Sequence, residues 1–125
     1  MKVEKAKNLI SSMIVTDHSV TRFSERTKFY YADANFLKAY LINVLVRGIH
    51  MKKSVNACEF RKNTEFTSQV RNRKAIVFGN HVYIFAEDYS ALVTVLNLVK
   101  ACRMEYSVLQ RKKNRGIDQR LRQAA

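Results

Sequence analysis

The 125-residue chain contains no proline, no tryptophan, three glycines and two cysteines. With so few residues that interrupt secondary structure, no flexible linker is predicted, and the length fits one domain. Cys58 and Cys102 form no CxxC pair, so a zinc site is not indicated, and two buried thiols in a reducing compartment are the simpler interpretation. The longest apolar run, residues 41–46, is too short to span a bilayer, and no signal peptide is recognised. A cytoplasmic protein without membrane association is therefore expected.

Acidic residues are also scarce. Ten Asp and Glu stand against 23 Lys and Arg, which gives a formal net charge of +13. Folding does not require this excess, because like charges repel one another in a compact chain. The imbalance favours a polyanionic partner, with RNA or DNA ahead of an anionic membrane surface. A basic surface without a partner is the alternative.

Several motifs of catalysis are missing as well. The chain contains no G-x-S-x-G, no G-x-x-x-x-G-K, no G-x-G-x-x-G and no H-E-x-x-H, and its acidic residues are scattered. Serine hydrolases, P-loop proteins, dinucleotide-binding proteins and metal hydrolases are thus disfavoured. We expect neither a cofactor nor a metal site.

The segment 16–28, TDHSVTRFSERTK, holds the most informative pattern that is present. His18, Arg22 and Arg26 follow one another at intervals of four residues, so on a helix they share one face. Thr16 or Asp17 can cap the start of that helix. An imidazole between two guanidinium groups can hold a phosphate and move a proton beside it. A solvated basic helix face explains the same spacing, so both interpretations stay open.

Hydrophobic periodicity predicts the other elements. Residues 2–13 form either a short helix or a loosely held arm, and a stronger amphipathic helix runs from an Asp33 cap to a stop at Gly48. The period then changes to that of strands, with Gly79-Asn80 as a hairpin turn. Strand-like patterns occur at residues 55–60, 66–70, 75–78, 82–85 and 91–96, and about four antiparallel strands are expected from them.

A final helix is expected at residues 99–112, and the basic stretch from about 113 to 125 is expected to be frayed. Helices grouped before and after a run of strands are typical of an α+β fold. The prediction is a single domain in which N-terminal helices pack on a four-stranded antiparallel sheet that a C-terminal helix follows.

Three short motifs, in this order, resemble the RelE-like endoribonuclease superfamily, which includes the RelE and BrnT toxins. They are H-x3-R-x3-R on an early helix, G-N-x-V-Y-I-F on a hairpin and L-V-T-V on a closing strand. The resemblance covers roughly residues 15–98. It implies a curved antiparallel sheet backed by helices, an RNA-binding concave face and metal-independent cleavage of RNA. It also implies a site made of His18, Arg22, Arg26 and Thr94.

Each of these residues has a chemical role to offer. RNA cleavage without a metal ion needs a base, an acid and a group that stabilises the charged phosphorane. His18 can serve as base or acid, and the two arginines can clamp the scissile phosphate. Arg22 and Arg26 can instead pair with Glu25 or Asp17, and His18 can simply cap its helix or pack against the sheet.

Other candidates belong to the strands and to basic runs. Thr94 can bind a phosphate oxygen, or serve only as a β-former. Tyr83 can stack on a base, although packing in the core is the alternative. Two basic clusters are expected to contact the phosphate backbone of a nucleic acid: Arg71, Arg73 and Lys74, and Arg111, Lys112, Lys113 and Arg115.

Two functions follow from these features of the sequence. The first is a metal-independent endoribonuclease of the RelE-like toxin type that acts on RNA, including ribosome-bound mRNA, and has an acidic antitoxin as partner. The second is a non-catalytic module on the same fold that binds nucleic acid or protein. A phage-encoded inhibitor of a host nucleoprotein complex is an example of this second class.

Overall fold

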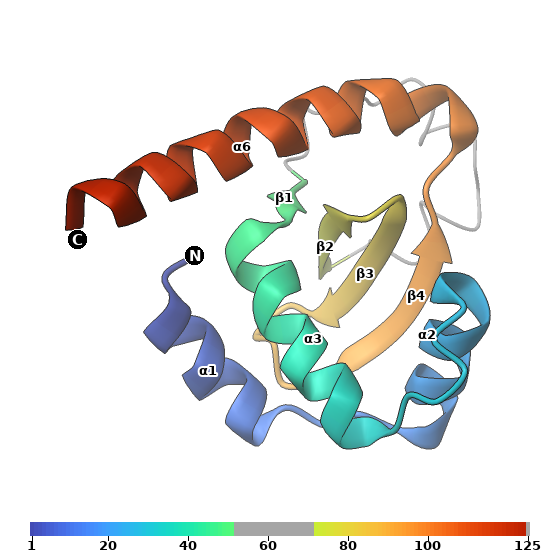
Figure 1. Ribbon diagram of the computed structural model, residues 1–125. Coiled ribbons are helices and arrows are strands. Elements are labelled where there is room, and N and C mark those ends of the chain that lie inside the picture. Colours follow the sequence, from blue (N-terminus) through green and yellow to red (C-terminus); the bar gives the residue numbers. More distant parts are fainter. Residues whose placement is uncertain (52–71, 125) are drawn as a thin grey trace.

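The computed structural model describes residues 1–51 and 72–124. Within these residues, three helices precede the sheet and one long helix follows it (Figure 1). The elements are, in order, α1 (Val3–Ser12), α2 (Asp17–Thr27), α3 (Ala34–Arg47), β1 (Ile49–His50), β2 (Arg73–Phe78), β3 (His81–Ala86), β4 (Leu92–Asn97), a short 3-10 helix η1 (Lys100–Cys102) and α6 (Arg103–Ala124).

The four strands pair in the order β1-β2-β3-β4, and every pairing is antiparallel. The predicted α+β class and its four-stranded antiparallel sheet are thus confirmed. The two-residue β1 follows directly after α3, where no strand was predicted. The strands predicted at residues 55–60 and 66–70 lie outside the described residues. Gly79 and Asn80 form the predicted hairpin turn, with φ of 58° and 64°.

One face of the sheet is covered by the N-terminal helices. The apolar side of α3 packs there together with Ala6 and Ile10 of α1 and with Phe23 of α2. These helical residues meet side chains that the strands direct to this face, namely Ile76, Tyr83, Phe85, Leu92 and Val95. The segment predicted as a helix or an arm is therefore a helix with a buried side.

Both ends of α3 have local causes. The Asp33 side chain accepts a hydrogen bond from the Phe36 backbone N–H at 2.7 Å, which caps the first turn. The helix ends at Gly48, which has extended backbone geometry. A Cβ atom on Gly48 would collide with the Ile76 side chain and the Val44 carbonyl oxygen, so glycine is required here by close approach.

The opposite face of the sheet carries a second core. Ala75, Val77, Val82 and Ile84 point to this side and meet Leu98, Cys102 and Tyr106. The chain continues from β4 through η1 into α6, and the first turns of α6 lie over this face (Figure 1). Both faces of the sheet are therefore covered, one by the N-terminal helices and the other by the segment that follows β4.

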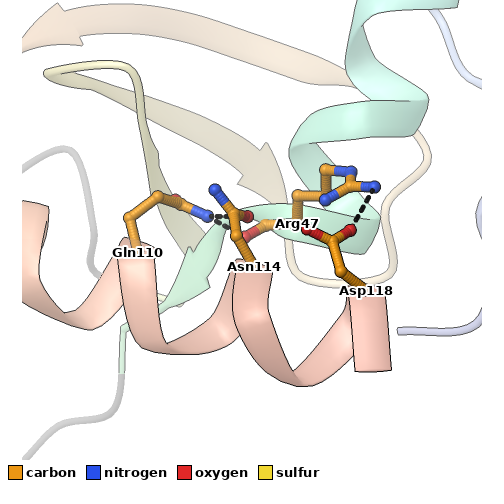
Figure 2. Close-up of polar contacts among 4 residues, drawn as sticks. All are labelled: Arg47, Gln110, Asn114 and Asp118. Carbon is orange, nitrogen blue, oxygen red and sulfur yellow. Dashed lines mark hydrogen bonds and ion pairs between the residues drawn. The ribbon is translucent and has the colours of Figure 1, made fainter. Parts of the chain in front are cut away.

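The rest of α6 is fastened to the C-terminal end of α3. The Gln110 amide donates a hydrogen bond to the Arg47 carbonyl oxygen at 2.6 Å, and the Lys113 ammonium donates one to the Gly48 carbonyl oxygen at 2.6 Å. Arg47 also pairs with Asp118 at 3.7 Å (Figure 2). The two hydrogen bonds satisfy carbonyl groups that a helix end leaves without intrahelical partners.

The predicted C-terminal boundary was wrong. The helix was expected to end near residue 112 and to fray beyond it, but α6 continues to Ala124. The anchoring contacts of Lys113 and Asp118 lie beyond the expected end, and they were not visible in the hydrophobic pattern. Within the described residues, none of the helices has the length and apolar character that crossing a membrane would require.

A candidate nucleic-acid interface

The helix α2 is held at the edge of β4 by buried contacts. Thr16 caps its start by accepting a hydrogen bond from the Ser19 backbone N–H at 3.1 Å. The buried Ser19 hydroxyl donates to the Leu92 carbonyl oxygen at 2.8 Å. Phe23 is fully buried in the core between the sheet and the N-terminal helices. Because Ser19 and Phe23 point into the protein, the helical period places His18, Arg22 and Arg26 on a different face of α2.

Those three side chains line a pocket of about 240 Å³ at the junction of α2 and the sheet. The pocket is lined by His18, Arg22, Arg26, Arg73, Val93, Thr94 and Leu96. All four residues of the site that the family resemblance implied therefore lie around one cavity. The structure adds a third guanidinium group, that of Arg73, and two apolar side chains.

An irregularity in β4 is what turns Thr94 toward the pocket. Thr94 pairs with Ile84, but the next residue of β3 pairs with Leu92, so Val93 is an extra residue in the ladder. Leu92 belongs to the core between the sheet and the N-terminal helices. Strict alternation would place the Thr94 side chain on that same face of the sheet. The bulge shifts the alternation by one residue, so Thr94 faces the pocket and is nearly buried, at 8% exposed.

The pocket is electropositive. Arg22 pairs with Glu25 at 3.3 Å, but both side chains are about half exposed, at 43% and 54%, so water screens this ion pair. The Arg26 Nε atom is buried and has no hydrogen-bond partner among the described residues.

The first basic cluster is divided by the sheet. Arg73 precedes Ala75 and Val77 at alternate positions, so it shares their face and reaches the pocket. Lys74 alternates with Arg73, is exposed and does not line the pocket. Arg71 lies outside the described residues. These three cations were predicted as one cluster because they are close together in the sequence. Arg73 and Lys74 are consecutive residues of a strand, so their side chains point to opposite faces of the sheet.

The proposed role of Tyr83 was wrong. Its side chain is fully buried, and its ring lies 6.2 Å from that of Tyr40 and 6.4 Å from that of Phe23. Burial raises the pKa of the Tyr83 phenol well above its usual range. A ring inside this aromatic cluster holds α2 and α3 on the sheet, and it cannot stack on a base at the surface.

The second basic cluster lies on α6 and does not line the pocket. Arg111, Lys112 and Arg115 are exposed, as a backbone-binding role requires. Lys113 is partly buried, and its ammonium is bound to the Gly48 carbonyl oxygen. Lys113 is thus an anchor of α6, and the role predicted for it at the nucleic-acid surface is not supported by its position.

His81 lies directly after the Gly79-Asn80 turn and is partly buried. Its Nε2 atom lies 2.9 Å from the Arg26 carbonyl oxygen, so this nitrogen carries the proton and donates to α2. Burial lowers the pKa of His81, and the hydrogen bond to Arg26 opposes that effect. The imidazole ties the last turn of α2 to the hairpin and so helps to position Arg26.

Sequence reasoning missed the bulge at Val93, and it assigned Arg73 to a backbone-binding cluster without placing it beside His18. Arg73 could have been found from its alternation with Ala75 and Val77, once the pocket face of β2 was known. No group of three His, Cys, Asp or Glu side chains suited to a metal ion occurs among the described residues. In comparisons with known proteins, no family model, no curated protein and no solved structure matches the chain.

Proposed function

We propose that the chain binds single-stranded RNA and cleaves it at the phosphate held in the α2–β4 pocket. The observation that carries this proposal is the convergence of three guanidinium groups and one imidazole on a cavity of about 240 Å³. A net charge of +13 supports a polyanion as the ligand. The family resemblance, carried by the same residues, supports RNA as that polyanion.

The pocket supplies the parts that phosphate recognition needs. Arg22, Arg26 and Arg73 donate planar pairs of N–H groups that match phosphate oxygens, and Thr94 offers a hydroxyl. Val93 and Leu96 exclude water from one wall, which strengthens the attraction between the cations and the phosphate. As charge builds up on the phosphorane, these donors stabilise it more than they stabilise the substrate.

His18 supplies the proton transfer. Neutral His18 takes the proton of the ribose 2′-hydroxyl, whose oxygen attacks phosphorus as the bond to the 5′-oxygen breaks. Water on the open side of the pocket protonates the departing 5′-oxygen, and the resulting hydroxide is neutralised by the proton on His18. The products are a 2′,3′-cyclic phosphate and a 5′-hydroxyl end.

One observation favours a non-catalytic binding module instead. His18 is exposed, and no hydrogen bond from another described residue fixes its ring. General bases are commonly oriented by a third group. The same arginine-lined pocket would then hold a phosphate without cleaving the chain, and the acidic surface of a partner protein would be a competing ligand.

Cleavage of labelled RNA in excess EDTA tests the proposal. Wild type should yield product with a 2′,3′-cyclic phosphate, and His18→Ala should lower the rate by about a hundred- to ten-thousandfold while binding stays nearly unchanged. Arg22→Lys should keep the charge but lose the paired N–H groups, so cleavage should fall more than binding.

Asp17→Ala, next to His18 in the sequence but absent from the pocket lining, is the matched control. If wild type and His18→Ala show the same negligible cleavage on several RNAs and on translating ribosomes, the binding module is the correct function. If RNA does not bind even at low salt, the RNA-cleaving and RNA-binding functions both fail.

A further inference from the structure

A second pocket adjoins the first one and shares Arg26 with it. Its volume is about 440 Å³, and it lies between the end of α2, the β2–β3 turn and the start of α6. The pocket is lined by Glu25, Arg26, Lys28, Gly79, Asn80, His81, Asn97 and Arg103. Arg26 therefore stands between two cavities, with its buried Nε group still lacking a partner among the described residues.

The lining of this pocket differs from that of the first. Lys28 and Arg103 add positive charge, but Glu25 places a carboxylate in the same cavity. A carboxylate repels a phosphate and accepts hydrogen bonds from N–H groups. Asn80 and Asn97 can both donate and accept hydrogen bonds. This combination suits the edge of a nucleobase flanked by backbone phosphates, and it suits a second bare phosphate poorly.

The frame of the pocket is already formed. Lys28 ends α2 in the left-handed conformation with φ of 68°. The tight turn at Gly79 and Asn80 is tied to the end of β4 by a hydrogen bond from the Leu98 N–H to the Asn80 carbonyl oxygen at 2.9 Å. His81 joins that turn to the Arg26 carbonyl oxygen. These contacts hold the backbone at the end of α2 and at the turn in place before a ligand binds. A fixed backbone lowers the entropy cost of binding.

We propose that the second pocket is a base-binding subsite for the nucleotide next to the phosphate held by Arg22 and Arg26. The proposal rests on the function proposed above, since it extends the same RNA strand past Arg26. Asn80, Asn97 and Glu25 bind the exposed edge of that base, as occurs when proteins recognise unpaired RNA. Lys28 and Arg103 hold the backbone on either side of it.

An abasic scan tests this proposal. Four 2′-O-methyl tetranucleotides, each lacking one base, are compared with the intact tetranucleotide for binding to the full chain. For wild type, removal of one particular base should weaken binding by about tenfold, as for the loss of one well-formed base contact. The double variant Asn80→Gly, Asn97→Ala should bind that abasic probe and the intact probe equally well.

The variants are chosen to keep charge and fold. Asn80→Gly tolerates the positive φ of the turn, and Asn97 is exposed at the end of β4, so neither change alters net charge. Asn80→Gly alone repeats the test if the double variant fails to fold. Asn43→Ala, which removes an exposed amide from α3 without lining the pocket, is the control.

The outcomes separate the two proposals. If no abasic position matters, or if the sensitive position stays sensitive in the double variant, the base subsite is overturned. The proposed function still stands in either case, provided that Arg26→Ala weakens binding of the intact tetranucleotide. If wild type binds no tetranucleotide at low salt, the base subsite and the proposed function are both overturned.

Discussion

The two basic regions of the molecule hold their charges in different ways. Around the α2–β4 pocket, cations from a helix and from a distant strand converge on one cavity, and α2 is fixed by the buried contacts of Ser19 and Phe23. On α6, Arg111 and Arg115 line a hollow of about 440 Å³ that this one helix forms alone, and Asp118 places a carboxylate beside them. Lys113 is used as an anchor. Basic residues therefore converge from two separate elements in one region, and they come from a single helix in the other.

This contrast predicts which ligands each region binds. A converging site can recognise one phosphate with directed hydrogen bonds, so it should act on short oligonucleotides. A diffuse basic face acts through the summed charge of many phosphates, so it should matter only for long chains and low salt. Substitutions in the pocket should therefore have the largest effects on short ligands, and those on α6 should have smaller ones.

Arg26→Ala should weaken binding of a 2′-O-methyl tetranucleotide by about a hundredfold. The substitution removes charge-assisted hydrogen bonds that are each worth about 1.5–3 kcal/mol. Arg111→Ala removes the same charge from α6 and should change that affinity by less than about twofold. Fluorescence anisotropy of the labelled tetranucleotide gives both constants. Equal losses of affinity in the two variants would show that the pocket contributes no more to binding than the overall positive charge of the protein does.

Ser19→Ala should lower the free energy of unfolding by about 2 kcal/mol. The Ser19 hydroxyl donates to the Leu92 carbonyl oxygen inside the protein, and its removal leaves that acceptor buried without this donor. Ser11→Ala is the matched control, because the Ser11 hydroxyl bonds to the Asn8 carbonyl oxygen at an exposed site. Urea unfolding measures both, and a small loss for Ser19→Ala would show that α2 is not held in this way.

Replacing Arg111, Lys112 and Arg115 together by alanine should affect only long RNA. At low salt we expect about a tenfold loss of affinity for a long single strand, with little change for the tetranucleotide. The slope of log affinity against log salt should become shallower by about 2, since three phosphate contacts are lost. An unchanged slope would show that these exposed cations do not meet RNA.

The smallest expected effect concerns pH. Burial holds the pKa of His81 below its ordinary value, with Arg103 and Arg26 lowering it further. The unfolded chain therefore binds a proton more readily than the folded chain does, so stability should fall as the pH drops below about 6.5. His81→Gln keeps an N–H donor for the Arg26 carbonyl oxygen and should make this fall shallower. His50, whose pKa is also lowered by burial, should account for part of what remains.

Much of the fold could be predicted from the sequence because its signals are local. The Asp33 cap, the Gly79-Asn80 turn and the apolar spacing of α3 each act within a few residues, and all three lie where they were expected. The end of α6 was missed because it depends on contacts with α3, such as the pairing of Asp118 with Arg47, that span about 70 positions of the chain.

The site was predicted in part for the same reason. His18, Arg22 and Arg26 share a helix face, so their proximity follows from the helical period. Arg73 reaches them only through the register of β2 and β3, and Thr94 only through the bulge at Val93. The burial of Tyr83 depends on aromatic side chains from α2 and α3, and no local pattern around Tyr83 indicates it.

The most direct test of the central claim is an NMR titration. Nitrogen-15-labelled wild type is titrated with the 2′-O-methyl tetranucleotide, and amide signals are followed residue by residue. If the pocket is the binding site, signals of Arg22, Arg26, Arg73 and Thr94 should shift together with one dissociation constant, while those of Arg111 and Arg115 stay in place. Shifts confined to α6, with the pocket signals unmoved, would contradict the account.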